Sequence, residues 1–330
     1  MKIFISIASY QDPLLKNTIQ DAFNKAQNKS ALVFGICDQS NREISLDDLE
    51  FKEQIRYEHV EALLSRGPCW ARARIQALFN NEDFYLQIDS HTLFDENWDQ
   101  KLIDALLTIE KRGNISSYHK KPFITGYPRG FSFNETLQKY EKESSDKNVQ
   151  PIGYRKDSLF LRGRFSRQIG LVTNIHDFTH GYLLAAGCLF SRGSLVKEIP
   201  YDHNYYFYGE EISLMLRLFT NGYSAFHMGD MPVFHLYTNH KTIDRPLHWS
   251  PEEDKDRIIK WHQLEEKSIL RLDELVKGAK LEGFGLGNKR SLNEYKTLSG
   301  VDLVEKKVVD EDRSTTSKFF EEVNWKDGPL

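Results

Sequence analysis

Short apolar runs alternate with helical patterns over the first 90 residues. β-Branched and other apolar residues predict four strands, at residues 3–8, 31–40, 55–59 and 84–89. Between these runs, apolar residues recur at helical spacing and predict helices over 14–26 and 70–79. Strands and helices that alternate at this pitch form βαβ units. The pattern therefore predicts a parallel sheet whose carboxyl-terminal edge carries the ligand.

The second half of the chain has a less regular pattern. Residues 120–167 are rich in Gly, Pro, Lys and Ser and predict an irregular insertion. An apolar run at 182–190, a helix over 210–221 that ends at Gly222 and a short strand within 230–237 are expected next. Beyond residue 250 charged residues become more frequent. Helical periodicity that includes Ile258 predicts a helix over 251–277, and two weaker amphipathic stretches follow.

Composition and charge exclude several classes of protein. The 330 residues include 44 basic and 48 acidic ones, a net charge of -4, which is too balanced for a nucleic-acid-binding surface or a polybasic membrane anchor. With 40% hydrophobic and 12% aromatic residues, the composition is that of a folded, soluble protein. Three distant cysteines make no disulfide framework, and no apolar run is long enough for a signal peptide or a membrane span. We therefore expect a cytoplasmic protein.

A candidate metal site follows the strand at 84–89. In extended backbone, residues two apart face the same side, so Asp89 and His91 can point together from the end of the strand. One carboxylate and one imidazole leave a divalent ion open to diphosphate oxygens and water. A surface turn is the alternative interpretation of this triplet. His235, at the end of the apolar strand PVFHLY, is a candidate third ligand or a packed histidine.

Two acidic residues begin the helix expected at 210–221. Glu210 and Glu211 follow Gly209, and the macrodipole favours acids at a helix N-terminus whatever their function. The functional interpretation is a carboxylate that holds sugar hydroxyls, because Gly209 allows the backbone to come close. Aromatic residues at 205–208 can supply apolar faces for a pyranose or fill the core.

Two further motifs are weaker. His176 and His180 have the spacing of a helical zinc site but lack the glutamate of HExxH. The stretch 283–290 resembles a phosphate loop only loosely, and a turn is favoured, from which Lys289 and Arg290 can reach a diphosphate.

Together these segments resemble the GlcNAc-transferase family typified by the enzyme that modifies hydroxyproline on the ubiquitin-ligase adaptor Skp1. The resemblance is carried, in collinear order, by residues 3–13, 66–91, 183–202, 205–237 and 285–303. It implies a GT-A type α/β fold: a Rossmann-like, mostly parallel sheet flanked by helices, with a C-terminal helical extension. Residues 1–250 would be the catalytic domain, with a nucleotide-binding half at about 1–118 and a sugar and acceptor half at about 119–250. Residues 251–330 would be the extension packed on it.

The resemblance also implies an activity and a set of site residues. The family uses a UDP-sugar donor and a divalent metal, Mn²⁺ or Mg²⁺, and retains the anomeric configuration. The implied metal ligands are Asp89, His91 and His235. The donor would be bound by Ala8, Ser9, Tyr10 and Asp38 at the uridine, and by Arg66, Arg72, Asp89, Ser90, Gly187 and Arg290 elsewhere. Glu210 would hold the sugar beside Glu211, with either one available as a nucleophile, and a front-face route without a nucleophile stays open.

The expected reaction moves a sugar, GlcNAc above all, from UDP to a hydroxyl of a protein or glycan. Two alternatives stay open: a non-catalytic module that binds glycans or sugar nucleotides, and a metal-dependent phosphoesterase. Residues 238–242 make a longer loop than is usual in the family, and 130–170 match it poorly, so the acceptor is not carried over.

Overall fold

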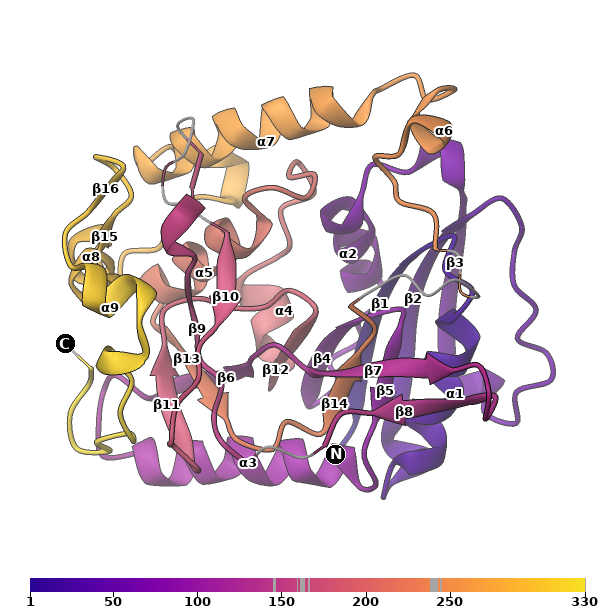
Figure 1. Cartoon of the computed structure of the whole chain (residues 1–330), viewed down its shortest axis with the longest axis horizontal. Coiled ribbons are helices and arrows are strands. Elements are labelled where there is room, and N and C mark those ends of the chain that lie inside the picture. The colour runs from indigo at the N-terminus through magenta and orange to yellow at the C-terminus, as the bar shows by residue number, and fades with distance from the viewer. Residues whose placement is uncertain are drawn as a thin grey trace.

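The chain is built around one eight-stranded sheet (Figure 1). A computed structural model describes residues 1–144, 147–158, 160, 164–165, 167–237, 243 and 245–329. In spatial order the strands of the large sheet are β11 (Phe178–Gly181), β13 (Tyr223–Met228), β6 (Lys121–Thr125), β12 (Cys188–Arg192), β4 (Phe84–Asp89), β1 (Ile3–Tyr10), β2 (Leu32–Ser40) and β3 (Ile55–Glu61). The loop 238–242, expected to be longer than in the family, lies outside the described residues.

The sheet is mixed. Strand β1 pairs in parallel with β2 and β4, and β2 pairs in parallel with β3, which confirms the predicted βαβ units. Strand β12 runs antiparallel to both β4 and β6, while β6 is parallel to β13. The carboxyl ends of β1, β2 and β4 therefore meet at one edge, where the candidate metal residues were expected.

Helices cover both faces of the sheet. They are α1 (Leu15–Lys25), α2 (Pro68–Ala77), α3 (Trp98–Gly113), α4 (Ser194–Glu198), α5 (Glu210–Thr220), α6 (Pro251–Asp254), α7 (Trp261–Val276), α8 (Leu292–Ser299) and α9 (Glu311–Thr315). Figure 1 shows α3 and α7 on opposite sides of the sheet. The alternation of side chains along β1 explains the two layers, because Ile5 is buried with residues of α1 and α3, and Phe4 with residues of α2, α5 and α7.

Smaller elements complete the chain. A second sheet has the order β5 (Thr92–Phe94), β14 (Val233–His235), β7 (Arg129–Asn134) and β8 (Lys139–Lys142). Two-stranded sheets are formed by β9 (Ile152–Tyr154) with β10 (Gln168–Gly170) and by β15 (Val301–Asp302) with β16 (Lys307–Val308). Single 3₁₀ turns are η1 (Lys29–Ala31), η2 (Lys52–Gln54), η3 (Ala62–Leu64), η4 (Lys156–Ser158), η6 (Leu281–Gly283) and η7 (Ser317–Phe319).

Two sequence expectations need correction, and one helix was not predicted. Residues 120–167 are not simply irregular, because β6 lies in the large sheet between β12 and β13. Strand β6 has five residues and contains Pro122. Because proline is unusual within a strand, the sequence pattern did not indicate β6, and its pairing with neighbouring strands identifies it. The helix expected over 251–277 is interrupted, since α6 ends at Asp254, α7 begins at Trp261, and Ile258 between them is 93% exposed. Helix α3, for which we made no prediction, buries Leu102 and Leu106 on one face.

The C-terminal helices share the core of the large sheet. Leu272 of α7 and Tyr295 of α8 belong to the same buried cluster as Phe4 and Leu216. The division of the chain at residue 250 stays a prediction. Among the described residues, no helix has both the length and the apolar character needed to cross a lipid bilayer.

Candidate metal and sugar-nucleotide site

Three predicted metal ligands come together at the carboxyl-terminal edge of β4. One ligand atom from each of Asp89, His91 and His235 lies within 4.8 Å of the others. The strand pairing explains the meeting, because His235 in β14 is the antiparallel partner of Thr92, which directly follows His91. The imidazole rings of His91 and His235 are 4.5 Å apart, and His235 Nε2 lies 3.2 Å from Asp89 Oδ2. Residues 146 positions apart in the chain thus form one cluster.

The ionisation of this cluster suits a cation. Burial alone raises the pKa of Asp89, but the hydrogen bond from His235 and the charge of Arg72 outweigh it and hold the pKa below its usual value. Burial lowers the pKa of His235, so its ring is neutral near pH 7. A charged carboxylate and a neutral imidazole are the forms that bind a divalent ion.

Gly187 gives Asp89 the room it needs. A Cβ atom at position 187 would lie 2.6 Å from Asp89 Oδ2, which is closer than real side chains come. Gly187 follows Ala186 in the turn before β12, so any other residue would push this backbone away from Asp89. Ala8 lies opposite Asp89 across β1 and β4. These two predicted donor-binding residues therefore adjoin the cluster.

Asp12, which our sequence analysis did not select, contacts His91 of the cluster and the neighbouring Ser90. Its Oδ2 lies 2.6 Å from His91 Nδ1 and accepts a hydrogen bond from Ser90 Oγ at 2.7 Å. Its Oδ1 accepts from the Leu14 backbone at the start of α1. Ser90, a predicted donor-binding residue, is thus engaged with Asp12. The position of Asp12 just beyond β1, at the same edge as Asp89, was the signal that could have identified it.

Arg72 occupies a different place from the one expected. Its buried guanidinium bridges two carboxylates, with Nη2 2.8 Å from Asp89 Oδ1 and Nη1 bonded to Glu210 Oε1. Glu210 is itself only 5% exposed and also accepts a hydrogen bond from Tyr201 at 2.5 Å. Both partners of Glu210 are therefore protein groups. This placement argues against the predicted contact of Glu210 with the donor sugar and of Arg72 with the diphosphate.

Glu211 is the neighbouring carboxylate that faces a cavity. Its Oε1 accepts a hydrogen bond from the Ala186 backbone at 2.9 Å, and its Oε2 accepts one from Gln168 at 2.6 Å. Burial raises its pKa to about 7. Gly209, at φ 85°, lies in the left-handed region just before α5 and sets the direction in which the helix starts. The two adjacent acids thus point to different surroundings.

The predicted uridine residues lie at the carboxyl ends of β1 and β2. Ser9 and Asp38 are partners across these strands. Asp38 is buried and accepts hydrogen bonds from Tyr57 and Ser40 at 2.8 Å, while burial raises its pKa. The Tyr10 hydroxyl is bonded to Glu253 and Arg257. The segment after residue 245, which sequence analysis did not connect with nucleotide binding, therefore covers this end of the site.

The two other arginines predicted to contact the donor differ in their surroundings. Arg66 is exposed just before α2. Arg290 donates to backbone oxygens of Tyr118 and Tyr223, each at 2.7 Å, and its guanidinium stacks on the Tyr118 ring at 3.9 Å. Strand registers place Tyr223 at the level of residue 83, so this point is about 20 Å along the strands from Asp89. The structure does not bring Arg290 to the site.

The alternative histidine pair does not form a helical zinc site. His180 lies in strand β11, and His176 is exposed before it. His180 Nε2 is 3.2 Å from His119 Nε2, and burial lowers the pKa of His180 to about 3. Within the described part of the chain, the cluster at Asp89 is the one group of three or more such residues with metal-binding spacing.

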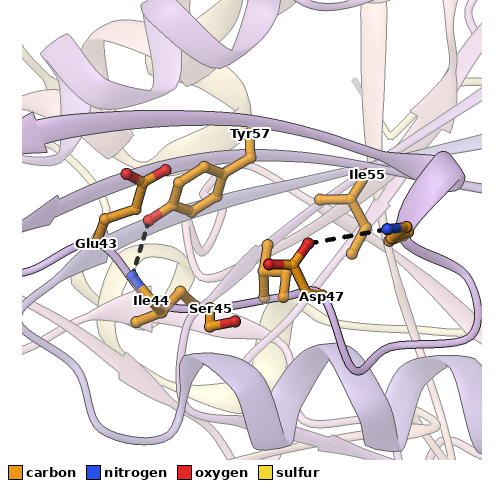
Figure 2. A pocket seen from close by; sticks show the side chains of 8 residues that line it. Glu43, Ile44, Ser45, Asp47, Ile55 and Tyr57 are labelled. Carbon is orange, nitrogen blue, oxygen red and sulfur yellow. Dashed lines mark hydrogen bonds and ion pairs between the residues drawn. The ribbon is translucent and has the colours of Figure 1, made fainter.

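A further cavity lies at the edge of the large sheet formed by β3. Figure 2 shows Tyr57 with its hydroxyl toward the Ile44 backbone, and Asp47 paired with a lysine. The cavity has a volume of about 490 Å³ and is lined by residues 43–47, Lys52, Ile55 and Tyr57. Tyr57 also bonds Asp38, but none of the predicted site residues lines this cavity. We therefore place the candidate site at the Asp89 edge.

Comparison with solved structures gives distant similarities. TarS of S. aureus is 14% identical with a TM-score of 0.47, over 97% of this chain and 51% of TarS. GalNAc-T7 with UDP, GalNAc and Mn²⁺ is 10% identical with a TM-score of 0.47, over 90% of this chain and 54% of that one. TarS residues 1–349 with UDP-GlcNAc are 16% identical with a TM-score of 0.45, over 97% and 85%. The chain thus spans about half the length of the first two.

Sequence comparison is more decisive. No curated protein matches the chain. The model of the family described as Glycosyltransferase (GlcNAc) matches residues 2–50 and 41–305, which is most of the chain and includes every residue of the Asp89 cluster. The protein belongs to the GlcNAc glycosyltransferase family.

Proposed function

We propose that this protein transfers GlcNAc from UDP-GlcNAc to a hydroxyl acceptor, with retention of configuration at the anomeric carbon and with bound Mn²⁺ or Mg²⁺. The observation that carries the proposal is the meeting of Asp89, His91 and His235 at the strand edge. Family membership supports the reaction type. The solved complexes of TarS with UDP-GlcNAc and of GalNAc-T7 with UDP and Mn²⁺ favour the donor class and the ion.

The cluster has the donor set that such an ion needs. Asp89 would supply a carboxylate oxygen, and His91 and His235 would each supply a ring nitrogen, with His91 Nδ1 already committed to Asp12. A bound divalent ion neutralises the charge that develops on a departing diphosphate. Three protein ligands leave positions open for diphosphate oxygens.

The other predicted site residues have separate roles in donor binding. Arg72 fixes the orientation of Asp89 through its 2.8 Å contact and neutralises part of its charge. The edge formed by Ser9, Tyr10 and Asp38 would hold uridine, and exposed Arg66 is free to approach a phosphate. We assign the sugar contact to Glu211, because it lines a cavity, whereas Glu210 is 5% exposed and forms a buried ion pair with Arg72. A covalent route to retention would use Glu211 as the nucleophile.

Titration of UDP into the protein, with and without Mn²⁺, tests the metal and nucleotide together. We expect Mn²⁺ to raise UDP affinity at least tenfold, and His235→Ala to remove that increase while the melting temperature stays within a few degrees. A His235→Ala protein with undiminished manganese dependence would exclude His235 as a ligand.

Donor hydrolysis without an acceptor tests the sugar. UDP-GlcNAc, UDP-GalNAc and UDP-glucose are compared at equal concentration, and the anomer first released is identified by NMR. Fastest hydrolysis of UDP-GlcNAc with release of the α-anomer supports the proposal. Preference for a GDP- or CDP-sugar, or release of the β-anomer, would contradict it.

The phosphoesterase alternative needs more ligands than the structure supplies. Two-ion phosphoesterases hold their metals with a larger set of carboxylates and histidines. In the described segments no second group accompanies the Asp89 cluster, and His180 is engaged with His119. The glycosyltransferase assignment accounts for the same residues without additional ligands.

A further inference from the structure

We infer that Thr18 of α1 is a positioning residue for the metal ligand His91. The inference rests on the proposed function and adds to it a residue that our sequence analysis did not select. Thr18 is 1% exposed, and its hydroxyl is bonded to backbone atoms on both sides of His91. Asp12 contacts the ring of His91, so Thr18 and Asp12 act on different parts of the same ligand.

The hydroxyl of Thr18 forms two hydrogen bonds of normal length. It donates to the backbone oxygen of Ser90 at 2.8 Å and accepts from the backbone N–H of Thr92 at 2.9 Å. A hydroxyl can donate and accept at the same time, whereas valine has the same shape and can do neither. Ser90 and Thr92 are both buried, so water does not compete for these two bonds.

These two bonds fix the backbone at His91. The oxygen of Ser90 belongs to the peptide group before the Cα atom of His91, and the N–H of Thr92 belongs to the peptide group after it. Because each peptide group is planar, a bond to both groups restricts φ and ψ of His91. The backbone oxygen of His91 also accepts from the Leu236 N–H at 3.2 Å. Thr18 therefore sets the direction in which the His91 side chain leaves the backbone.

Strand β5 directs two of its N–H groups toward α1. Strand β14 pairs with β5 and places Thr92 opposite His235. The N–H groups of Thr92 and Phe94 are donated to side chains of α1, to Oγ1 of Thr18 and, at 2.7 Å, to Oδ2 of Asp21. Thr18 and Asp21 are three residues apart and lie on one face of the helix. This face of α1 satisfies buried backbone groups of β5, which would otherwise lack an acceptor.

The position of His91 matters because a metal ion needs its ligands at set distances. Ligand atoms of Asp89, His91 and His235 lie within 4.8 Å of one another, and a ring nitrogen must come to roughly 2 Å from the ion. Asp89 belongs to β4 and His235 to β14, whereas His91 lies between β4 and β5. Loss of a group that supports a histidine ligand lowers metal affinity about 10- to 100-fold.

Two variants at Thr18 and one matched control test this role. Thr18→Val removes the hydroxyl and keeps the shape, whereas Thr18→Ser keeps the hydroxyl. Thr220→Val is the control, because the buried Thr220 hydroxyl donates to the Leu216 oxygen at 2.7 Å and accepts from the Gly287 N–H at 2.8 Å. Thr220 lies in the last turn of α5, whereas Glu211 lies in the first. Both valine variants thus lose the same kinds of bond, at different places in the fold.

The first measurement is Mn²⁺ binding to the full chain without UDP, followed by electron paramagnetic resonance. We expect Thr18→Val to weaken Mn²⁺ binding about tenfold or more, and Thr18→Ser and Thr220→Val to stay within about twofold of the unmutated protein. Equal Mn²⁺ affinity in the two valine variants would contradict the inference, as would a loss in Thr18→Ser as large as in Thr18→Val. Failure of the proposed metal site is seen separately, as absence of Mn²⁺ binding in the unmutated protein.

The second measurement is amide hydrogen exchange in the metal-free protein. The Thr92 amide should exchange about tenfold faster or more in Thr18→Val, because its acceptor is lost, and at the unmutated rate in Thr220→Val. The Gly287 amide should show the reverse pattern. The Phe94 amide, which is bonded to another side chain of α1, should change less than that of Thr92. An unchanged rate for Thr92 in Thr18→Val would overturn the inference, whether or not the protein binds Mn²⁺.

Discussion

His91 Nδ1 lies 2.6 Å from Oδ2 of Asp12, a carboxylate that also binds Ser90. The side chain of Asp12 is 5% exposed, so this contact is shielded from competing water. Burial raises the pKa of Asp12, but the hydrogen bond from His91 and its charge outweigh burial, and the net shift is downward. Asp12 therefore fixes the ring of His91 with Nε2 directed away from it.

Replacing Asp12 should loosen the metal site without removing a ligand. We expect Asp12→Asn to weaken Mn²⁺ binding about 10- to 100-fold, because loss of a carboxylate behind a metal-binding histidine has this effect. Manganese titration followed by electron paramagnetic resonance measures it. A melting temperature near that of the unmutated protein is the control. Unaltered Mn²⁺ affinity would show that the contact between Asp12 and His91 is only structural.

Removal of Arg72 should lower the free energy of unfolding of the protein. Arg72→Met leaves Asp89 and Glu210 near each other without their shared cation, and we expect a loss of about 3–5 kcal/mol in the free energy of unfolding. Adding Glu210→Gln removes one of the two charges and should restore part of that loss. Denaturant unfolding of both single variants and the double variant measures the coupling. Strictly additive losses would contradict the bridging role.

The two adjacent glutamates should behave differently. We expect Glu211→Gln to lower turnover about 100-fold or more, equivalent to about 2.7 kcal/mol, while UDP affinity changes little. Glu210→Gln should act mainly on stability, because its carboxylate binds Arg72 and Tyr201. Turnover, UDP affinity and melting temperature are measured for both proteins. Normal turnover in Glu211→Gln would remove that residue from the reaction.

Glu211 also predicts a pH dependence of stability. Its pKa of about 7 in the folded chain exceeds the ordinary value of 4.5, so between these pH values the folded state binds more protons than the unfolded state. Stability should therefore fall as the pH rises from about 4.5 to about 7. Glu211→Gln lacks this loss and should be more stable at pH 8 by up to about 3 kcal/mol, with no gain at pH 4. A gain of equal size at both pH values would contradict the assignment.

Arg66 and Arg290 form a contrasting pair. Arg290→Ala removes charged hydrogen bonds to the backbone oxygens of Tyr118 and Tyr223 and should cost about 2–3 kcal/mol of stability, with UDP affinity unchanged. Arg66→Ala, at an exposed position beside α2, should leave the melting temperature unchanged and weaken UDP binding. Thermal unfolding and calorimetric titration separate the two effects. Weakened UDP binding in Arg290→Ala would restore its predicted role at the diphosphate.

The sequence by itself determined the features that depend on local patterns. Alternating apolar runs identified β1, β2, β3 and β4, because strand and helix periodicities are read from neighbouring residues. The same patterns gave their parallel pairing, and the position of Asp89 at a strand end followed from the run before it. The family resemblance, carried by collinear motifs, was confirmed by the match over residues 2–50 and 41–305.

The tertiary structure decided which polar groups meet. Nothing local distinguishes Glu210 from Glu211, yet a rotation of about 100° per helical residue directs one toward Arg72 and the other toward Gln168. The contact between Asp12 and His91 depends on the pairing of β1 with β4, which brings the ends of these two strands together. Arg290, predicted at the end of the loosely phosphate-loop-like stretch 283–290, lies about 20 Å along the strands from Asp89. Strand register, not sequence order, sets that separation.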